Sequence, residues 1–403
     1  MTIQSRTPGT PSLLRAINDR AALELLLERG PLTRAQLGEL TGLSKVTASQ
    51  LVERLEERAL VTRVGEQAGG RGPNAQLYAV VPNSAYVVGV HVGPTTVVAA
   101  SADITGRMTA RVEVSTDGAD DPVGRVHAAV MEAAQQAGAE WRLVRRVVLG
   151  TPGVVDPATG DISFAFDLPQ WHRGLREALS SDLDRPVSFE NDVNLAAIAE
   201  ARLGAGRGVE DFALVWISRG VGLATVLGGR LHRGAAGAAG EIGYLYVPGG
   251  RSPDFDRTGN PRGLQPAFQH TITEAAVRAL AAEHGFPAPT ATDAIAAAAA
   301  AAGADGPDRT TGAAVLDELA RRVALGVVAV AVVLDPSIVV IAGEVGSAGG
   351  DALARRIEDY VARLAPVSPR VVVTQVPDEP VLRGALLTAL DDAREEVFGA
   401  TRP

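Results

Sequence analysis

The spacing of apolar residues changes near residue 82, and this change divides the chain into two parts that require different folds. Before residue 82, apolar side chains recur at helical spacing in three short segments and then alternate in two others. Beyond it, β-rich segments alternate with helical ones through the rest of the 403 residues. We therefore expect a small domain over residues 1–82 and a larger α/β body over residues 83–403.

The small part has the element order of a winged helix-turn-helix. A second helix is expected over Arg34–Leu40, after the capping residue Thr33, and a Thr-Gly-Leu turn follows it. Ser44 is expected to cap a third helix whose core-facing side carries Val46, Leu51, Val52 and Leu55. Two strands near residues 60–64 and 75–80 would then form a hairpin with a glycine-rich tip.

The third helix of this motif carries residues that suit double-stranded DNA. Its short polar side chains match the donors and acceptors of base edges and phosphates, and the candidates are Ser44, Lys45, Thr47, Ser49 and Gln50. Arg71, between glycines at the hairpin tip, is a candidate for a minor-groove contact. The alternative is a small helical module that contacts another protein. The combination of turn, helix face and hairpin tip favours DNA.

The charge distribution fits a DNA-binding head on an acidic body. The chain has 38 basic and 47 acidic residues and a net charge of −9. Residues 1–80 hold ten basic and eight acidic residues, a net of +2, which leaves −11 for the remainder. The single lysine of the chain, Lys45, lies on the expected DNA-facing helix. The acidic body would keep the protein off bulk nucleic acid.

Nothing in the sequence indicates a membrane partner. Residues 1–12 are polar and contain two prolines, which excludes the apolar core of a signal peptide. The longest apolar segment, residues 324–341, is interrupted by Asp335 and Pro336 and is too short to span a bilayer. We therefore expect a cytoplasmic protein.

Four segments of the body together resemble the ROK family of repressors and sugar kinases. They are Gly89–Thr95, Gly150–Asp156, Glu190–Glu200 and Gly234–Tyr244, in the order and spacing of that family. The resemblance implies an actin-like ATPase fold with two lobes. One lobe would span residues 83–190 with a C-terminal return, and the other about 191–385.

The resemblance also implies a sugar site. Asn191, Asp192 and Glu241 match the family residues that hydrogen-bond the hexose hydroxyls, and Asp192 matches the catalytic base. Tyr244 and Gln265 stand where the family has a histidine and a glutamate, so the specificity of the site should differ. The alternative for Asn191 and Asp192 is a purely structural role as caps of the helix that begins near Val193, and for Glu241 it is an ion pair with an arginine.

The loops that would hold ATP depart from the family pattern. His91 replaces an aspartate, and Pro94 replaces a glycine and so removes one N–H donor. The second phosphate loop reads Ser218-Arg219-Gly220-Val221-Gly222, with a large side chain in place of a small one, and Glu344 places a carboxylate on the adenosine side. We therefore expect no ATP cofactor and no enzymatic activity.

The sequence also lacks the ligands of the zinc site that some family members carry. Its cysteine positions fall on Asp256, Thr258 and Gly263, its histidine position falls on Tyr244, and the chain contains no cysteine. Asp256 alone cannot provide a tetrahedral site, so we expect no zinc.

Three hypotheses follow for the function. The first is a repressor that responds to a sugar or sugar derivative and binds a palindromic operator as a homodimer or homotetramer. The second is a DNA-binding protein of this family whose body takes no small molecule. The third is an active sugar kinase with a regulatory head.

Overall fold

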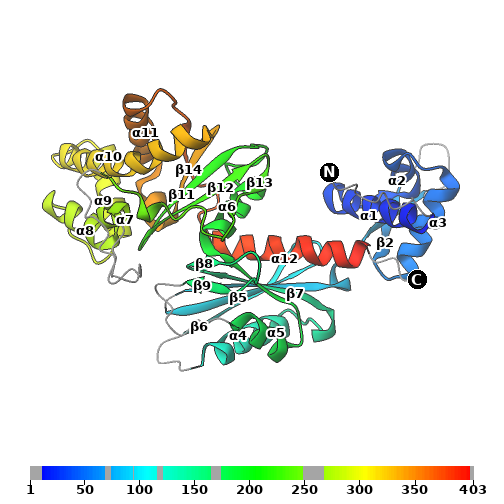
Figure 1. Ribbon diagram of the computed structural model, residues 1–403. Helices are drawn as coiled ribbons and strands as arrows, with labels where there is room; N and C mark the ends of the chain where they lie inside the picture. The colour runs from blue at the N-terminus through cyan, green and yellow to red at the C-terminus, as the bar shows by residue number, and fades with distance from the viewer. Residues whose placement is uncertain are drawn as a thin grey trace, which may run out of the picture. The chain divides into compact units, whose positions relative to one another are not determined.

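The structure is a computed structural model that describes residues 11–68, 74–93, 95–115, 121–164, 174–247 and 267–399 (Figure 1). The chain divides into two units. The first comprises residues 1–149, 176–188 and 385–403, and the second comprises residues 150–175 and 189–384. Arg71, Pro94, Gln265 and the three expected cysteine positions of the zinc site lie outside the described residues.

The winged helix-turn-helix occupies the N-terminal part of the first unit. Its elements are α1 (Pro11–Arg29), β1 (Leu32–Thr33), α2 (Arg34–Thr41), α3 (Lys45–Glu57), β2 (Val61–Gln67) and β3 (Ala75–Val80). Thr33 and Gln36 form a reciprocal capping box at the start of α2, and Gly42 ends that helix in the left-handed conformation. The three strands form a sheet in the order β1-β3-β2. The sequence analysis did not predict β1, which pairs Leu32 with Tyr78.

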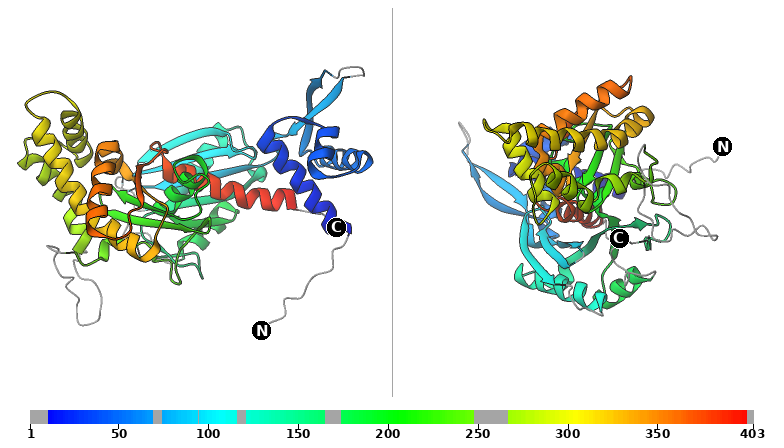
Figure 2. Two further views of the ribbon diagram at one scale, coloured as in Figure 1. Left: turned by 90° about the horizontal axis from the view of Figure 1, so that it is seen from above. Right: turned by 90° about the vertical axis from the view of Figure 1, so that its left-hand side faces the viewer.

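The rest of the first unit is built on a five-stranded sheet in the order β10-β7-β4-β5-β6. Its strands are β4 (Tyr86–Val92), β5 (Thr96–Asp103), β6 (Met108–Ser115), β7 (Val144–Thr151) and β10 (Val187–Asn191). The helices are α4 (Pro122–Gln136), α5 (Leu175–Leu183) and α12 (Pro380–Gly399), with 3-10 turns at Pro82–Ser84 and Trp141–Leu143. Gly89 of β4 lies so close to Leu386 of α12 that a β-carbon would be 2.9 Å from it. Figures 1 and 2 show α12 on the face of this sheet opposite α4 and α5.

The second unit repeats the strand order of the first. Its sheet runs β13-β12-β11-β14-β15, so that in both sheets the first three strands along the chain form an antiparallel meander. The strands are β11 (Phe212–Ile217), β12 (Val221–Leu227), β13 (Arg230–Leu231), β14 (Ile338–Ala342) and β15 (Arg370–Val373). Strands β11, β14 and β15 are parallel. This duplication is the arrangement that the sequence resemblance led us to expect.

Helices cover both faces of the second sheet because its central strands, β11 and β14, are apolar throughout. Ala213, Val215 and Val339 pack against the side formed by α7 (Ala267–Ile272), α8 (Glu274–Glu283), α9 (Ala291–Gly303), α10 (Arg309–Leu334) and α11 (Gly343–Leu364). The alternate residues Leu214 and Val340 pack against α6 (Asp192–Leu203) on the other face. Two short strands, β8 (Val154–Val155) and β9 (Ile162–Phe164), and a 3-10 turn at Ile242–Tyr244 complete the unit.

Within the described ranges, none of the helices combines the length and the hydrophobicity needed to cross a bilayer.

Candidate functional site

The first candidate site is the N-terminal end of α3. Ser44 caps this helix by accepting a hydrogen bond from the backbone N–H of Thr47, at 3.2 Å, and the two hydroxyl groups lie 2.9 Å apart. Ser44, Lys45 and Gln50 are exposed, and Thr47 and Ser49 are half-buried. All five residues therefore share one helical end, where side-chain and backbone donors are available to a phosphate or a base edge.

Val46 is not in the core, and that expectation was wrong. Its side chain is 67% exposed, whereas Ala48, Leu51, Val52 and Leu55 are buried. The buried residues follow the spacing i, i+3, i+4, i+7, and Val46 lies on the opposite side of the helix. The helical phase alone could have revealed this. An exposed apolar side chain beside Lys45 suits contact with a thymine methyl group.

The opposite end of α3 is fixed by ion pairs to α1. Asp19 is buried, with its side chain 5% exposed, and it contacts Arg54 at 2.6 Å and Arg58 at 3.7 Å. Two arginines around one buried carboxylate give α3 a defined position on α1. These ion pairs to α1 therefore fix the orientation of α3, whose N-terminal end carries the DNA-facing candidates.

The second candidate site lies in the second unit, where β10 ends and α6 begins. Asn191 caps α6 by accepting a hydrogen bond from the N–H of Asn194 at 3.1 Å. Its amide donates to the carbonyl oxygen of Gly153 at 3.0 Å. Asn191 therefore has the structural role that we weighed against sugar binding, and it retains one N–H and one lone pair for a ligand.

A polar network that the sequence analysis did not identify supports this helix start. Glu190 accepts hydrogen bonds from the side chain of Asn194 at 2.8 Å and from the N–H of Asn191 at 3.0 Å. Its other oxygen pairs with Arg233 at 2.6 Å. Glu190 and Asn194 are buried. A buried carboxylate with three donors is well satisfied, so the network sets the position of Asn191 and Asp192.

The glycine-rich loop at residues 234–244 packs against the same region. A β-carbon at Gly237 would lie 1.9 Å from the carbonyl oxygen of Val155, and one at Gly240 would lie 1.9 Å from that of Leu223. Both glycines also have positive φ angles, which other residues rarely adopt. Gly237 therefore allows the loop that carries Glu241 and Tyr244 to approach β8, and Gly240 allows it to approach β12.

Among the residues of this site, Asp192 has the largest pKa shift. Burial, together with the negative charges of Glu241 and Glu344, raises its pKa to about 7, against the hydrogen bond that its carboxylate accepts from the N–H of Val193. Desolvation by the surrounding protein also raises the pKa of Glu241. Burial and the charge of Glu241 raise the pKa of Tyr244. Asp192, Glu241 and Tyr244 therefore lie in one electrostatic environment, whereas Gln265 lies outside the described residues.

Two side chains approach the loops that would face a nucleoside triphosphate. Glu344 is in the first turn of α11 and acts on the charge of Asp192, so a carboxylate is close to the base position. At Gly220, in the second phosphate loop, Gln269 already lies 3.3 Å from where a β-carbon would be. Anionic phosphates gain nothing from added carboxylates. Nor does the part of the chain that the structure describes bring together three or more metal-ligating side chains.

Each of the two parts of the chain matches a known protein family. Residues 87–392 match the ROK family, and residues 18–72 match the MarR family. A DNA-binding transcriptional dual regulator of Escherichia coli, NagC, is 27% identical over 242 residues, which are 59% of this chain and 59% of that regulator. The chain therefore spans less than two thirds of that relative. A xylose repressor of Caldicellulosiruptor bescii is 21% identical over 95% of this chain and 98% of its own length.

Solved structures give the same fold. A ROK family transcriptional regulator described as a homologue of the E. coli MLC protein matches 96% of this chain with a TM-score of 0.72 and 21% identity. A ROK hexokinase from Thermus thermophilus matches 77% of the chain with a TM-score of 0.60 and 27% identity. The expected fold, a winged helix-turn-helix followed by a two-lobed kinase-like body, is thereby confirmed.

Proposed function

The chain belongs to the ROK family, and on this premise we propose that it is a DNA-binding transcriptional regulator, a repressor controlled by a sugar or sugar derivative. The observation that carries the proposal is the exposed polar end of α3, with Ser44, Lys45 and Gln50 presented from a winged helix. The regulators among its relatives support the same reading.

In this proposal, double-stranded DNA is bound by Ser44, Lys45, Thr47, Ser49 and Gln50 of α3, with Arg71 of the hairpin tip added from the sequence alone. The helix would lie in a major groove. A homodimer or homotetramer would match a palindromic operator, because two-fold symmetry in the protein requires related half-sites in the DNA.

The effector would bind at Asn191, Asp192, Glu241 and Tyr244, with Gln265 added from the sequence. Carboxylates and an amide recognise vicinal hydroxyls by accepting and donating in pairs. The alternative without an effector is favoured by one observation, the use of Asn191 as a helix cap. A thermal-shift screen of mono- and disaccharides and their phosphates separates these two, because saturating ligand raises the melting temperature only where a site exists.

A kinase is the second candidate because Asp192, at the family base position, has a pKa of about 7, which is suitable for a general base. We propose that no catalysis occurs and that neither ATP nor zinc is bound, since Glu344 and Arg219 alter the nucleotide-facing loops and the chain has no cysteine. ATP-dependent phosphorylation of a hexose that disappears in Asp192→Asn would establish the kinase instead.

Footprinting of the DNA upstream of the protein's own coding sequence tests the main proposal. A protected region in low salt without sugar is expected from the wild-type protein. The variant Lys45→Gln should give weaker protection of the same region, while Arg20→Gln, at an exposed position on α1, should not change it. The absence of any protected region would contradict DNA recognition.

A further inference from the structure

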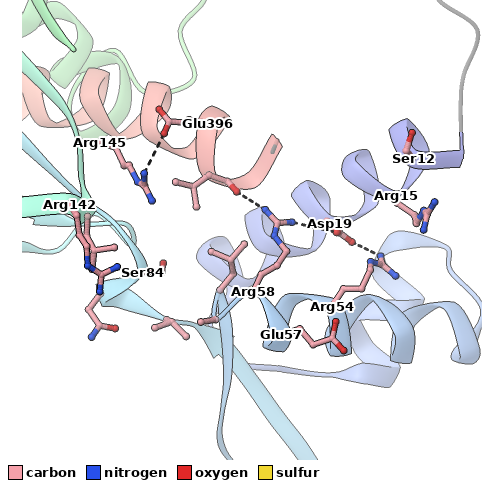
Figure 3. Close-up of a pocket in the computed structure, with 16 residues that line it drawn as sticks. Ser12, Arg15, Asp19, Arg54, Glu57, Arg58, Ser84, Arg142, Arg145 and Glu396 are labelled. Atoms are coloured by element: carbon pink, nitrogen blue, oxygen red, sulfur yellow. Dashed lines mark hydrogen bonds and ion pairs between the residues drawn. The ribbon is translucent and has the colours of Figure 1, made fainter. Parts of the chain in front are cut away.

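A pocket of about 1080 Å³ lies within the first unit, between the winged helix and the C-terminal end of α12 (Figure 3). Helices α1 and α3, the link at residues 81–84, residues 142–145 and the last turns of α12 form its wall. The charged residues in the wall are Arg15, Arg54, Arg58, Arg142, Arg145, Asp19, Glu57 and Glu396. Five positive and three negative side chains give this wall a net charge of +2, in a chain whose net charge is −9.

Ion pairs hold several of these guanidinium groups in place. Besides its contact with Asp19, Arg58 donates a hydrogen bond to the carbonyl oxygen of Val397 at 2.8 Å, near the C-terminal end of α12. Glu396 lies 3.7 Å from Arg145 and 2.6 Å from Arg146. The walls of the pocket are therefore pre-organised, and a ligand would not have to order them.

Three buried donors in the pocket wall have no acceptor within the described part of the chain. They are the Nε atoms of Arg54 and Arg145 and the hydroxyl of Ser84. A buried donor without an acceptor is unfavourable, and these three donors belong to side chains that also line the pocket. Guanidinium groups bind phosphate oxygens through paired N–H donors, so a phosphate group fits these positions better than a neutral ligand does.

We propose that this pocket is a second ligand site, which takes a small polyanion that carries at least one phosphate group. The volume is that of a metabolite site. Arg54 and Arg58 lie at the C-terminal end of α3, on the order of 20 Å along the helix from Ser44. The site is thus distinct from the DNA-facing end of α3 and from the loops at Asn191. Through Arg54 and Arg58, a bound anion would act on the C-terminal end of the recognition helix, next to the hydrogen bond from Arg58 to Val397.

Isothermal titration of the full chain with pyrophosphate, without DNA or sugar, tests the proposal. The wild-type protein should bind one pyrophosphate per chain. Arg145→Gln should weaken this binding at least tenfold, because it removes a guanidinium group from the wall. Arg20→Gln is the matched control, since Arg20 is on α1 but does not line the pocket. Arg142→Gln, at an exposed position in the wall, provides the same test if Arg145→Gln does not fold.

Two further variants locate the bound anion. Lys45→Gln changes the DNA-facing end of α3, and Asp192→Asn changes the sugar loops, and both should bind pyrophosphate as the wild type does. The proposal is overturned if the wild-type protein does not bind pyrophosphate. It is equally overturned if binding is lost in Lys45→Gln or Asp192→Asn and kept in Arg145→Gln and Arg142→Gln.

Discussion

The side-chain amide of Asn191 donates a hydrogen bond to the carbonyl oxygen of Gly153, 3.0 Å away, while its oxygen caps α6. One residue thus connects the loop after β7 to the start of the helix that carries Asp192. A residue placed in this way affects both the stability of the unit and the position of the carboxylate beside it.

Asn191→Ala should therefore destabilise the protein by about 1–2 kcal/mol, because it removes an N-cap and leaves the partly buried carbonyl of Gly153 without its donor. Urea unfolding measures this loss. Asn191→Ser is the matched control, because a hydroxyl keeps the cap without adding a charge and loses only the amide donor to Gly153. If Asn191→Ala and Asn191→Ser are equally unstable, the cap contributes nothing.

Asp192 should make the stability of the protein depend on pH. Its pKa is about 7 in the folded state and 3.8 as the ordinary value, so the folded state holds a proton that the unfolded chain releases. The free energy of unfolding should fall as the pH rises from about 4 to about 7, by an amount on the order of 2–4 kcal/mol. Asp192→Asn lacks this proton, and its stability relative to the wild type should increase across that range and level off above it. A difference that is independent of pH would show that the pKa of Asp192 is ordinary.

The charges around Asp192 should contribute unequally to its pKa. Glu241 raises it more than Glu344 does. Glu241→Gln should consequently lower the pKa of Asp192 further than Glu344→Gln, as measured by carbon NMR of the Asp192 carboxyl group during a pH titration. Glu283→Gln, an exposed change in the same unit, serves as the control and should leave the titration unchanged. The opposite order of the first two variants would contradict the described geometry.

The elements that the sequence predicted well are those with strong local signals. Helix α2 covers Arg34–Thr41 where Arg34–Leu40 was expected, because Thr33 caps its start and Gly42 ends it in the left-handed conformation. Helix α3 begins directly after Ser44 because the serine hydroxyl satisfies the N–H of Thr47. Both signals lie within a few residues of the element that they define.

The features that the sequence did not reveal depend on contacts between distant segments. Strand β1 has two residues and exists only because Leu32 pairs with Tyr78. The support of Asn191 by Glu190 involves Arg233, which is 43 positions away in the chain. Neither spacing nor composition encodes such pairs, so the candidate residues were found but the network that positions them was not.

Lys45 should contribute to DNA affinity mainly through charge. Lys45→Gln should weaken binding to specific and unrelated duplexes by a similar factor and reduce the slope of log affinity against log salt by about 1. Gln50→Ala should instead reduce the preference for the specific duplex, by about 1–3 kcal/mol at the base that Gln50 contacts. Fluorescence anisotropy over a series of salt concentrations measures both. An unchanged salt slope in Lys45→Gln would place Lys45 outside the interface.

The central claim joins DNA recognition by α3 to a sugar bound beside Asp192. The most direct test is the affinity of the full chain for its footprinted duplex, measured by anisotropy with and without each sugar that stabilises the protein. We expect at least one sugar to change the affinity by fivefold or more, in line with typical coupling between sites, and Asp192→Asn to abolish that change while still binding the duplex. A duplex affinity that no stabilising sugar alters, or an effect that survives in Asp192→Asn, would contradict the account.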